Sequence, residues 1–279
     1  MRLLAACGNL ASSVADLIST ARRLALFALW LSALPAALAA DTMPPATSPA
    51  YDYAKPALFA GTLYEIGSDR KKPLFTFQRR ATRSGDTVHV ERRYFGTNGA
   101  VAVLEKLVYE SNQLVSYRMQ EFQAQVSGTV LIARDPKNPA RQQIFISYGA
   151  GLRPPPGEAQ DLPPDTLVDD TLYPFMMAHW QELLRGDTVK FRFISFEWER
   201  TFAFCLVKTA ESVQHGRAVV EIRMRPASVL IAQLIDPLDF TVEKDNPHHI
   251  LSYTGRTTPR IRKGKSWKYL DAETVFDWK

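Results

Sequence analysis

The sequence predicts a mainly β fold: a single large curved antiparallel sheet, an unclosed β-barrel of about a dozen strands, with one or two helices packed in or near its concave face. Three observations favour it. Short runs with β-type alternation recur along the chain, turn signals separate them at intervals of roughly 10–14 residues, and helical spacing is convincing in one segment. Intervals this short suit hairpins and leave no room for β-α-β crossovers, which predicts antiparallel pairing.

Residues 1–40 have the features of an export signal. Arg22 and Arg23 precede an apolar run at 24–34, and the small-residue sequence Ala37-Leu38-Ala39 follows. We expect cleavage after Ala39 or Ala40 and a periplasmic location. The run is short for a bilayer of roughly 30 Å, and a retained membrane anchor is the alternative.

One β-rich domain is expected after the signal. Residues 41–56 contain four prolines and little periodicity, which predicts a flexible lead-in, and residues 57–279 suit one all-β domain. The composition of 46% hydrophobic and 23% charged residues is typical of globular proteins. An excess of 34 Lys and Arg over 29 Asp and Glu is too small to indicate a nucleic-acid binder.

The expected strands are runs rich in alternating apolar side chains, bounded by Gly, Asn, Asp, Ser or Pro. Both faces of the run at 101–109 carry apolar groups, which predicts a sheltered concave face and a partly covered back. In chain order the expected strands are Leu58–Glu65, Leu74–Ala81, Thr87–Phe95, Val101–Tyr109, Leu114–Phe122, Val126–Arg134, Gln142–Tyr148, Val189–Trp198, Thr201–Lys208, Ala218–Arg225, Leu238–Glu243, Ile250–Thr254 and Tyr269–Phe276.

A loop and then a helix separate the two groups of strands. Leu152–Pro164 contains five prolines and is predicted to be a loop. The helix after it is expected to use Asp170 as its cap, Pro174 in its first turn and Gly186 at its end. A shorter second helix is predicted at Ser228–Ile235.

Methionine and aromatic side chains on the first helix indicate a binding surface. Such side chains adapt to varied apolar ligands, and a helix laid over a curved sheet could present them to a cavity. Plain core packing is the alternative interpretation. The predicted ligand-binding residues, from this helix and the next strand, are Phe175, Met176, Met177, Trp180, Leu184, Phe191 and Phe193.

A basic segment at 256–268 carries six cations and no acid. It is interpreted either as a solvated connection between strands or as a contact with anionic head groups at a membrane surface. A tryptophan inside the segment suits the membrane interface. The predicted membrane-surface residues are Arg256, Arg260, Arg262, Lys263, Lys265, Trp267 and Lys268.

Catalytic and metal-binding motifs are weak. The sequence has no G-x-S-x-G, P-loop or H-E-x-x-H pattern, so neither an enzyme nor a cofactor is expected. Glu197 and Glu199 could form an acid–base pair but are interpreted as charges of a hairpin turn. His248 and His249 would point to opposite faces of a strand, so no metal is expected. Cys205, in an apolar run, is predicted to be a buried, inert thiol.

Three segments, Leu172–Leu184, Val189–Lys208 and Phe240–Gly255, carry a family resemblance. With the export signal and the predicted strands, they resemble periplasmic carriers of the outer-membrane lipoprotein carrier type and related uncharacterised exported families that share an unclosed β-barrel. The resemblance spans about residues 57–276. In such carriers an incomplete barrel with helices in its mouth holds acyl chains, so the resemblance implies a cavity but assigns no individual residue.

The leading hypothesis is therefore a non-enzymatic periplasmic protein that binds an acyl chain or another apolar ligand in a curved-sheet cavity and handles lipids or lipoproteins. The alternative is an envelope scaffold or assembly factor. In that case the proline-rich loop and the lead-in would contact another protein, because extended proline runs present preformed surfaces.

Overall fold

The computed structural model describes residues 51–151 and 153–278. The predicted signal peptide and most of the predicted lead-in lie outside these residues. Among the described residues, no helix combines the length and apolar character needed to cross a bilayer.

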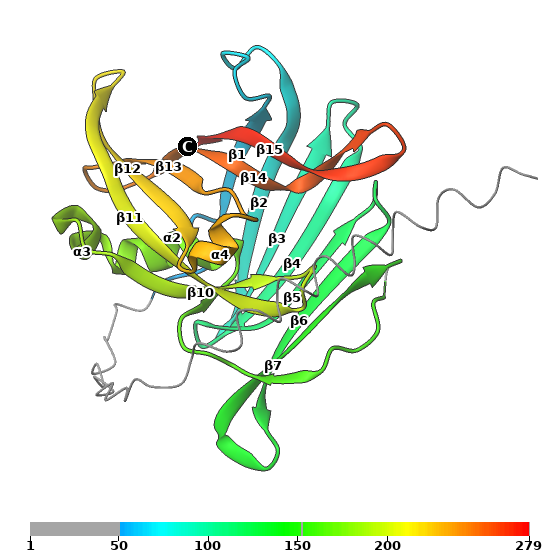
Figure 1. The fold of residues 1–279 in the computed structure, drawn as a ribbon. Coiled ribbons are helices and arrows are strands. Elements are labelled where there is room, and N and C mark those ends of the chain that lie inside the picture. Colours follow the sequence, from blue (N-terminus) through cyan, green and yellow to red (C-terminus); the bar gives the residue numbers. More distant parts are fainter. Residues whose placement is uncertain (1–50, 152, 279) are drawn as a thin grey trace, which may run out of the picture. The chain divides into compact units, whose positions relative to one another are not determined.

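The predicted fold class is confirmed: one mostly antiparallel sheet of 15 strands forms an unclosed, curled wall (Figure 1). The strands of the first half are β1 (Leu58–Tyr64), β2 (Pro73–Ser84), β3 (Thr87–Gly96), β4 (Val101–Glu110), β5 (Gln113–Glu121), β6 (Val126–Asp135), β7 (Asn138–Ala150) and β8 (Ala159–Asp161). Those of the second half are β9 (Thr166–Leu167), β10 (Val189–Ser195), β11 (Arg200–Gln214), β12 (Arg217–Pro226), β13 (Leu238–Glu243), β14 (Ile250–Lys263) and β15 (Ser266–Asp277).

The strand order explains the curl. It runs from β8 back to β1, continues from β1 to β15, and then descends to β9. The two outer strands are therefore neighbours in the chain, and only residues 162–165 connect them. Because an extended residue spans about 3.3–3.6 Å, these four residues hold the two edges of the sheet close together without a hydrogen-bonded closure.

Each expected strand is present, and the sheet adds two that were not predicted, β8 and β9. Strand β8 lies within the segment predicted to be a loop, where it pairs with Gln143–Phe145 of β7. Strand β9 runs parallel to β10, contrary to the prediction of antiparallel pairing. The physical reason is the helical segment between them, which supplies the crossover that a parallel pair requires.

The basic segment is a second correction, because it is not a connection between strands. Strand β14 continues to Lys263, and Arg262 and Lys263 pair with Trp267 and Ser266 of β15. The ladder is interrupted between Arg256 and Arg260 and then resumes. Backbone hydrogen bonds thus extend the hairpin almost to its turn.

The predicted helix is broken at His179 into α2 (Asp169–Ala178) and α3 (Trp180–Arg185). Asp170 is not its cap: the N-cap is Val168, whose N–H donates to Thr171 Oγ1 at 2.9 Å. Gly186 ends α3 with φ of 91°, the left-handed conformation that glycine adopts easily. The second predicted helix is reduced to α4 (Val229–Ala232).

The apolar core has two parts. One is built mainly by β1–β7 and includes Leu63 and Tyr109, both fully buried. The other packs α2 and α3 on β10–β13 and includes Met176 and Leu183, also fully buried. Burying each such side chain contributes roughly 1.5–3 kcal/mol, so the helical segment is held to the second half of the sheet mainly by apolar packing.

A buried ion pair fixes the same helix to the first half of the sheet. Arg79 of β2 donates from Nε to Asp170 Oδ1 at 2.7 Å, and both side chains are 4% exposed. Tyr109 donates to Asp170 Oδ2 at 2.9 Å, and Arg79 also donates to the carbonyls of Tyr53 and Pro56. Burial alone raises the pKa of Asp170, but the charge and hydrogen bonds of Arg79 outweigh it and hold the pKa below its usual range.

Replacing Asp170 with Asn should lower the free energy of unfolding by about 3–5 kcal/mol, because it leaves the Arg79 guanidinium buried without its counter-charge. Urea denaturation measures the loss. The matched control is Asp239→Asn, which removes the partner of the exposed Arg223 (Nε to Oδ1, 2.6 Å) and should cost less than about 1 kcal/mol. Equal losses in the two variants would contradict the anchoring role of Asp170.

Candidate ligand-binding cavity

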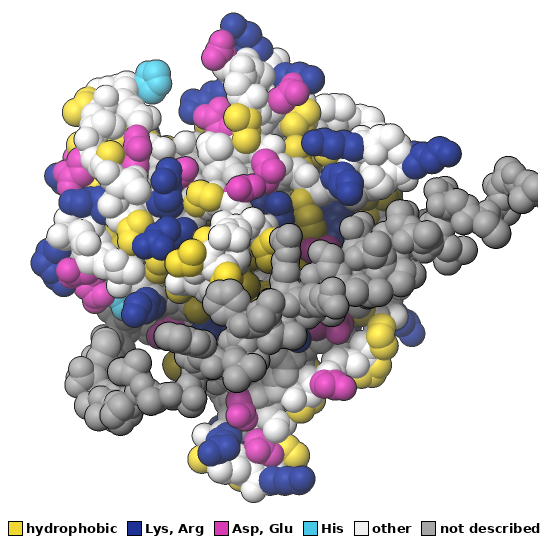
Figure 2. Space-filling model, in the orientation of Figure 1, with side chains coloured by type: hydrophobic (Ala, Val, Ile, Leu, Met, Phe, Trp, Pro, Cys, Tyr) yellow, Lys and Arg dark blue, Asp and Glu magenta, His cyan; other side chains and the backbone are white. Residues whose placement is uncertain are grey.

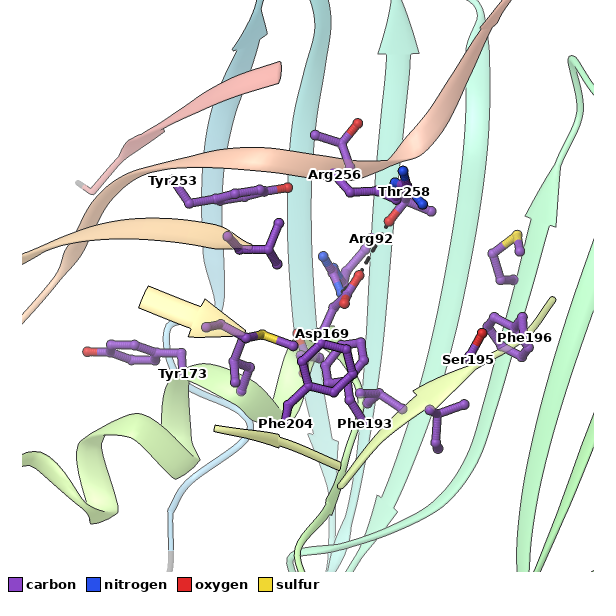
Figure 3. Close-up of a pocket in the computed structure, with 18 of the residues that line it drawn as sticks. Arg92, Asp169, Tyr173, Phe193, Ser195, Phe196, Phe204, Tyr253, Arg256 and Thr258 are labelled. Carbon is purple, nitrogen blue, oxygen red and sulfur yellow. Dashed lines mark hydrogen bonds and ion pairs between the residues drawn. The ribbon is translucent and has the colours of Figure 1, made fainter. Parts of the chain in front are cut away.

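A cavity of about 490 Å³ lies inside the curl of the sheet (Figure 3). Its wall takes side chains from β1–β3, β5 and β7 on one side and from β10–β15 on the other. The segment before β1, the start of α2 and the segment of α4 complete it. Small-molecule sites commonly measure about 300–1,000 Å³, so the space is large enough for a ligand of that class.

Aromatic and aliphatic side chains make up most of this wall. Phe59 stacks on Trp278 with ring centroids 5.0 Å apart, and Tyr253 lies 6.0 Å from Phe276. The other apolar lining residues include Phe77, Met119, Leu172, Phe193, Phe196, Phe202, Phe204, Met224, Leu238, Phe240 and Ile250. A surface of this kind favours an apolar ligand.

Of the seven predicted ligand-binding residues, Phe193 lines the cavity. Met176, Trp180 and Phe191 are buried in the core between the helices and β10–β13. Phe175, Met177 and Leu184 are half-buried against the same core. The structure therefore places these six in the packing beneath the helix and brings only Phe193 to the cavity wall.

The helix does contribute to the cavity, but from one turn earlier than predicted. Leu172, Tyr173 and Pro174 line it, together with Asp169 and Asp170. The sequence signal was present in the apolar pair Leu172-Tyr173. The helical stripe at Met176, Trp180 and Leu183 drew the prediction toward the far end of the helix.

Arg92 is the central polar group of the cavity wall. It comes from β3, is 8% exposed, and donates from Nη2 to the Tyr94 hydroxyl at 3.0 Å. Its Nε lies 3.2 Å from Glu105 Oε2, and its Nη1 lies 3.9 Å from Asp169 Oδ2. Thr258 donates to the same carboxylate oxygen of Asp169 at 3.3 Å, so Asp169 lies between Arg92 and Thr258 (Figure 3).

Behind Arg92 lies Glu105 of β4, which is fully buried. Its Oε1 accepts a hydrogen bond from the Tyr117 hydroxyl at 2.6 Å. Burial raises the pKa of Glu105 to about 7, although the neighbouring Arg92 charge acts in the opposite direction. Glu105 therefore changes charge near neutral pH while it remains next to the cavity arginine.

The predicted membrane-surface residues divide into two groups. Arg256 and Arg260 line the cavity. Arg260 donates to the hydroxyls of Tyr148 and Tyr269 and lies 3.3 Å from Glu121 Oε2, so it links β14 to β5 and β7 across the cavity.

The second group lies at the end of the β14–β15 hairpin, where Figure 2 shows dark-blue side chains gathered. Its members Arg262, Lys263, Lys265 and Lys268 are exposed, and Trp267 is half-buried. Together with Arg256, which is exposed as well as lining the cavity, these cations of the basic segment are accessible to an external surface.

The weaker candidates for catalysis or metal binding each contact different residues. Glu197 and Glu199 lie in the β10–β11 turn, as predicted; Glu197 lines the cavity, and Glu199 accepts a hydrogen bond from the Tyr148 N–H at 2.7 Å. His249 lies 3.2 Å from Glu243, whereas the ring of His248 lies against Trp180. Cys205 is buried, as predicted.

The α4 segment and the β10–β11 turn carry exposed apolar side chains, here called the apolar rim: Val229, Leu230, Leu234 and Trp198. The first three side chains are 80%, 75% and 69% exposed, and Leu234 and Trp198 also line the cavity. Exposed apolar groups are common singly, but several of them on segments that also line a cavity are typical of an interaction site.

Comparison with known proteins finds no family model and no curated protein that matches the chain. Among solved structures, it is similar to a β-barrel-like protein of domain of unknown function DUF1849 from Brucella abortus. The two chains are 9% identical with a TM-score of 0.35, and the match covers 79% of this chain and 93% of that one.

Replacing Glu105 with Gln should change how stability depends on pH. The pKa of Glu105 is raised from 4.5 to about 7, so the folded protein keeps a proton there that the unfolded chain has already released. The contribution of Glu105 to the free energy of unfolding therefore falls as pH rises from about 4.5 to about 7. The variant lacks this dependence.

Urea denaturation at several pH values measures the effect. The stability of Glu105→Gln relative to the wild type should increase by about 2–3 kcal/mol between pH 4.5 and pH 8. A difference that stays constant over this range would show that Glu105 does not titrate there.

Proposed function

We propose that the protein binds an acyl chain or a similar apolar ligand inside the curled sheet and acts without catalysis in lipid or lipoprotein handling in the periplasm. The observation that carries the proposal is the cavity of about 490 Å³ whose walls are mainly aromatic and aliphatic. A ligand that fills such a space removes apolar surface from water at roughly 25 cal/mol per Å².

The apolar rim supports a route into this cavity. Ile231, Leu234 and Ile235 line the cavity from the α4 segment, while Val229 and Leu230 of the same segment are exposed. An acyl chain that leaves a lipid surface along this path keeps apolar contact throughout. The helix is only four residues long and carries no buried residue, so its displacement disturbs little of the core.

The exposed end of the β14–β15 hairpin supports contact with an anionic membrane. Arg262, Lys263 and Lys265 are exposed there, and Lys268 follows on β15. Each cation near an anionic surface contributes about 1 kcal/mol, and the attraction decays over a Debye length of roughly 8–10 Å at moderate salt. Weak, reversible attachment of this kind suits a protein that collects or delivers lipid.

A delipidated sample titrated with a fluorescent long-chain fatty acid should show saturable binding. Ser195→Trp places an indole in the cavity, because Ser195 lines it, and should weaken binding by about tenfold or more. The control Ser195→Ala leaves the space open and should bind like the wild type. A flat titration of folded wild-type protein would refute the proposal.

Sedimentation with anionic vesicles at low salt should pull down the wild type, and rising salt should release it. Changing Arg262, Lys263 and Lys265 to Glu should reduce the bound fraction by more than about tenfold. The control changes Arg134, Lys137 and Arg141 to Glu; these side chains are exposed on the β6–β7 hairpin, and the change in net charge is the same. Equal losses of vesicle binding in the two variants would show that net charge alone, and not the end of the β14–β15 hairpin, attracts the protein to the membrane.

A further inference from the structure

We propose that Arg92 forms a subsite for the head group of the ligand, and that this head is a compact anion, a carboxylate or a phosphate, carried on an alkyl chain. The inference rests on the proposed function and adds the chemical class of the ligand. Its basis is a buried guanidinium that lines a mainly apolar cavity and leaves part of its hydrogen-bonding capacity unused.

The unused capacity is at Nη1. This atom is buried and makes no hydrogen bond with any described residue, while Nη2 is occupied by Tyr94. The guanidinium face is covered by the Phe77 ring, with Cζ 5.3 Å from its centroid, so the edge of the group is left for a ligand. A buried donor without a partner costs about 1–3 kcal/mol, and an anionic oxygen from a ligand would remove that cost.

Asp169 marks where such an oxygen would lie. Its Oδ2 is on the cavity side of Arg92 but is 3.9 Å from Nη1, too far for a hydrogen bond. Its side chain is 41% exposed, so water can solvate the carboxylate if a ligand displaces it from Thr258, whose hydroxyl donates to it at 3.3 Å. A ligand carboxylate in its place would accept from Arg92 and from the Thr258 hydroxyl.

The charged groups around Arg92 also set the pH at which it can bind an anionic ligand. The titratable and charged groups that act on it are Glu105 on β4, Tyr94 on β3, and Asp169 and Asp170 on α2. Asp170 is already paired with Arg79. Glu105, whose pKa lies at about 7, is therefore the group whose protonation releases Arg92, and anion binding should strengthen as pH falls from 8 to 6.

The walls beside Arg92 suit the rest of such a ligand. Phe193, Phe204 and Tyr253 lie around it in Figure 3, and apolar side chains continue from there toward the rim. A buried cation with an unused donor in a mainly apolar cavity suits an amphipathic molecule with its charge at one end.

The test is competition of dodecanoic acid, dodecyl phosphate and dodecanol against a fluorescent fatty-acid probe at pH 6.5. The acid or the phosphate should bind at least about tenfold more tightly than the alcohol, because only the anions can accept a charge-assisted hydrogen bond from Arg92. The stronger of the two anions identifies the head group. Equal binding of all three would overturn the subsite but leave the proposed function intact, whereas no binding of any would overturn the proposed function itself.

Variants assign the preference to Arg92. The double variant Arg92→Gln, Glu105→Gln removes both charges together, so no unpaired buried charge remains, and should abolish the preference for anions. Asp169→Asn removes the competing carboxylate and should increase that preference. Urea denaturation checks that the double variant is folded. If it is not, Asp169→Asn alone tests the proposal, and an unchanged or reduced preference for anions over dodecanol would refute the subsite.

Discussion

The buried pair between Arg79 and Asp170 is the interaction on which the rest of the structure depends. It joins the first turn of α2 to β2, and through the carbonyls of Tyr53 and Pro56 it also holds the segment before β1. Because α2 packs at the same time on β10–β13, this one pair connects the two halves of the sheet through its concave side. The position of Leu172 and Tyr173 in the cavity wall follows from it.

Polar contacts across the interior, rather than closure of the sheet, maintain the curl. Arg260 reaches from β14 to Glu121 on β5 and to Tyr148 on β7, and Asp169 lies between Arg92 on β3 and Thr258 on β14. The same groups are the polar features of the cavity. In the proposed function, shape and recognition are therefore coupled, because a ligand that competes for Arg92 or Arg260 would also act on contacts that hold opposite walls together.

The sequence predicted the fold well because period-2 alternation and turn residues are local signals. The hairpins from Leu58 to Ala150 could be predicted from them, although β2 and β7 extend beyond their predicted ends. The cavity was predicted less well, since its polar residues are single charges on otherwise ordinary strands. Glu105 was visible as one acid among apolar side chains on the inner face of its run. Its pairing with Arg92 depends on the β3–β4 register, where Arg92 lies opposite Glu105, and that information is not local.

The order of strands has a consequence for how the chain folds. All ladders join strands that are successive along the chain except one, that between β1 and β15, where Leu63 pairs with Thr274. Hairpins can form early and independently, but this last ladder brings together segments separated by almost the whole domain. Contacts of such sequence separation are slow to form because loop-closure entropy opposes them. Until they form, β1 and β15 each present an open edge, so the same topology that builds the cavity makes its assembly the step most exposed to intermolecular pairing.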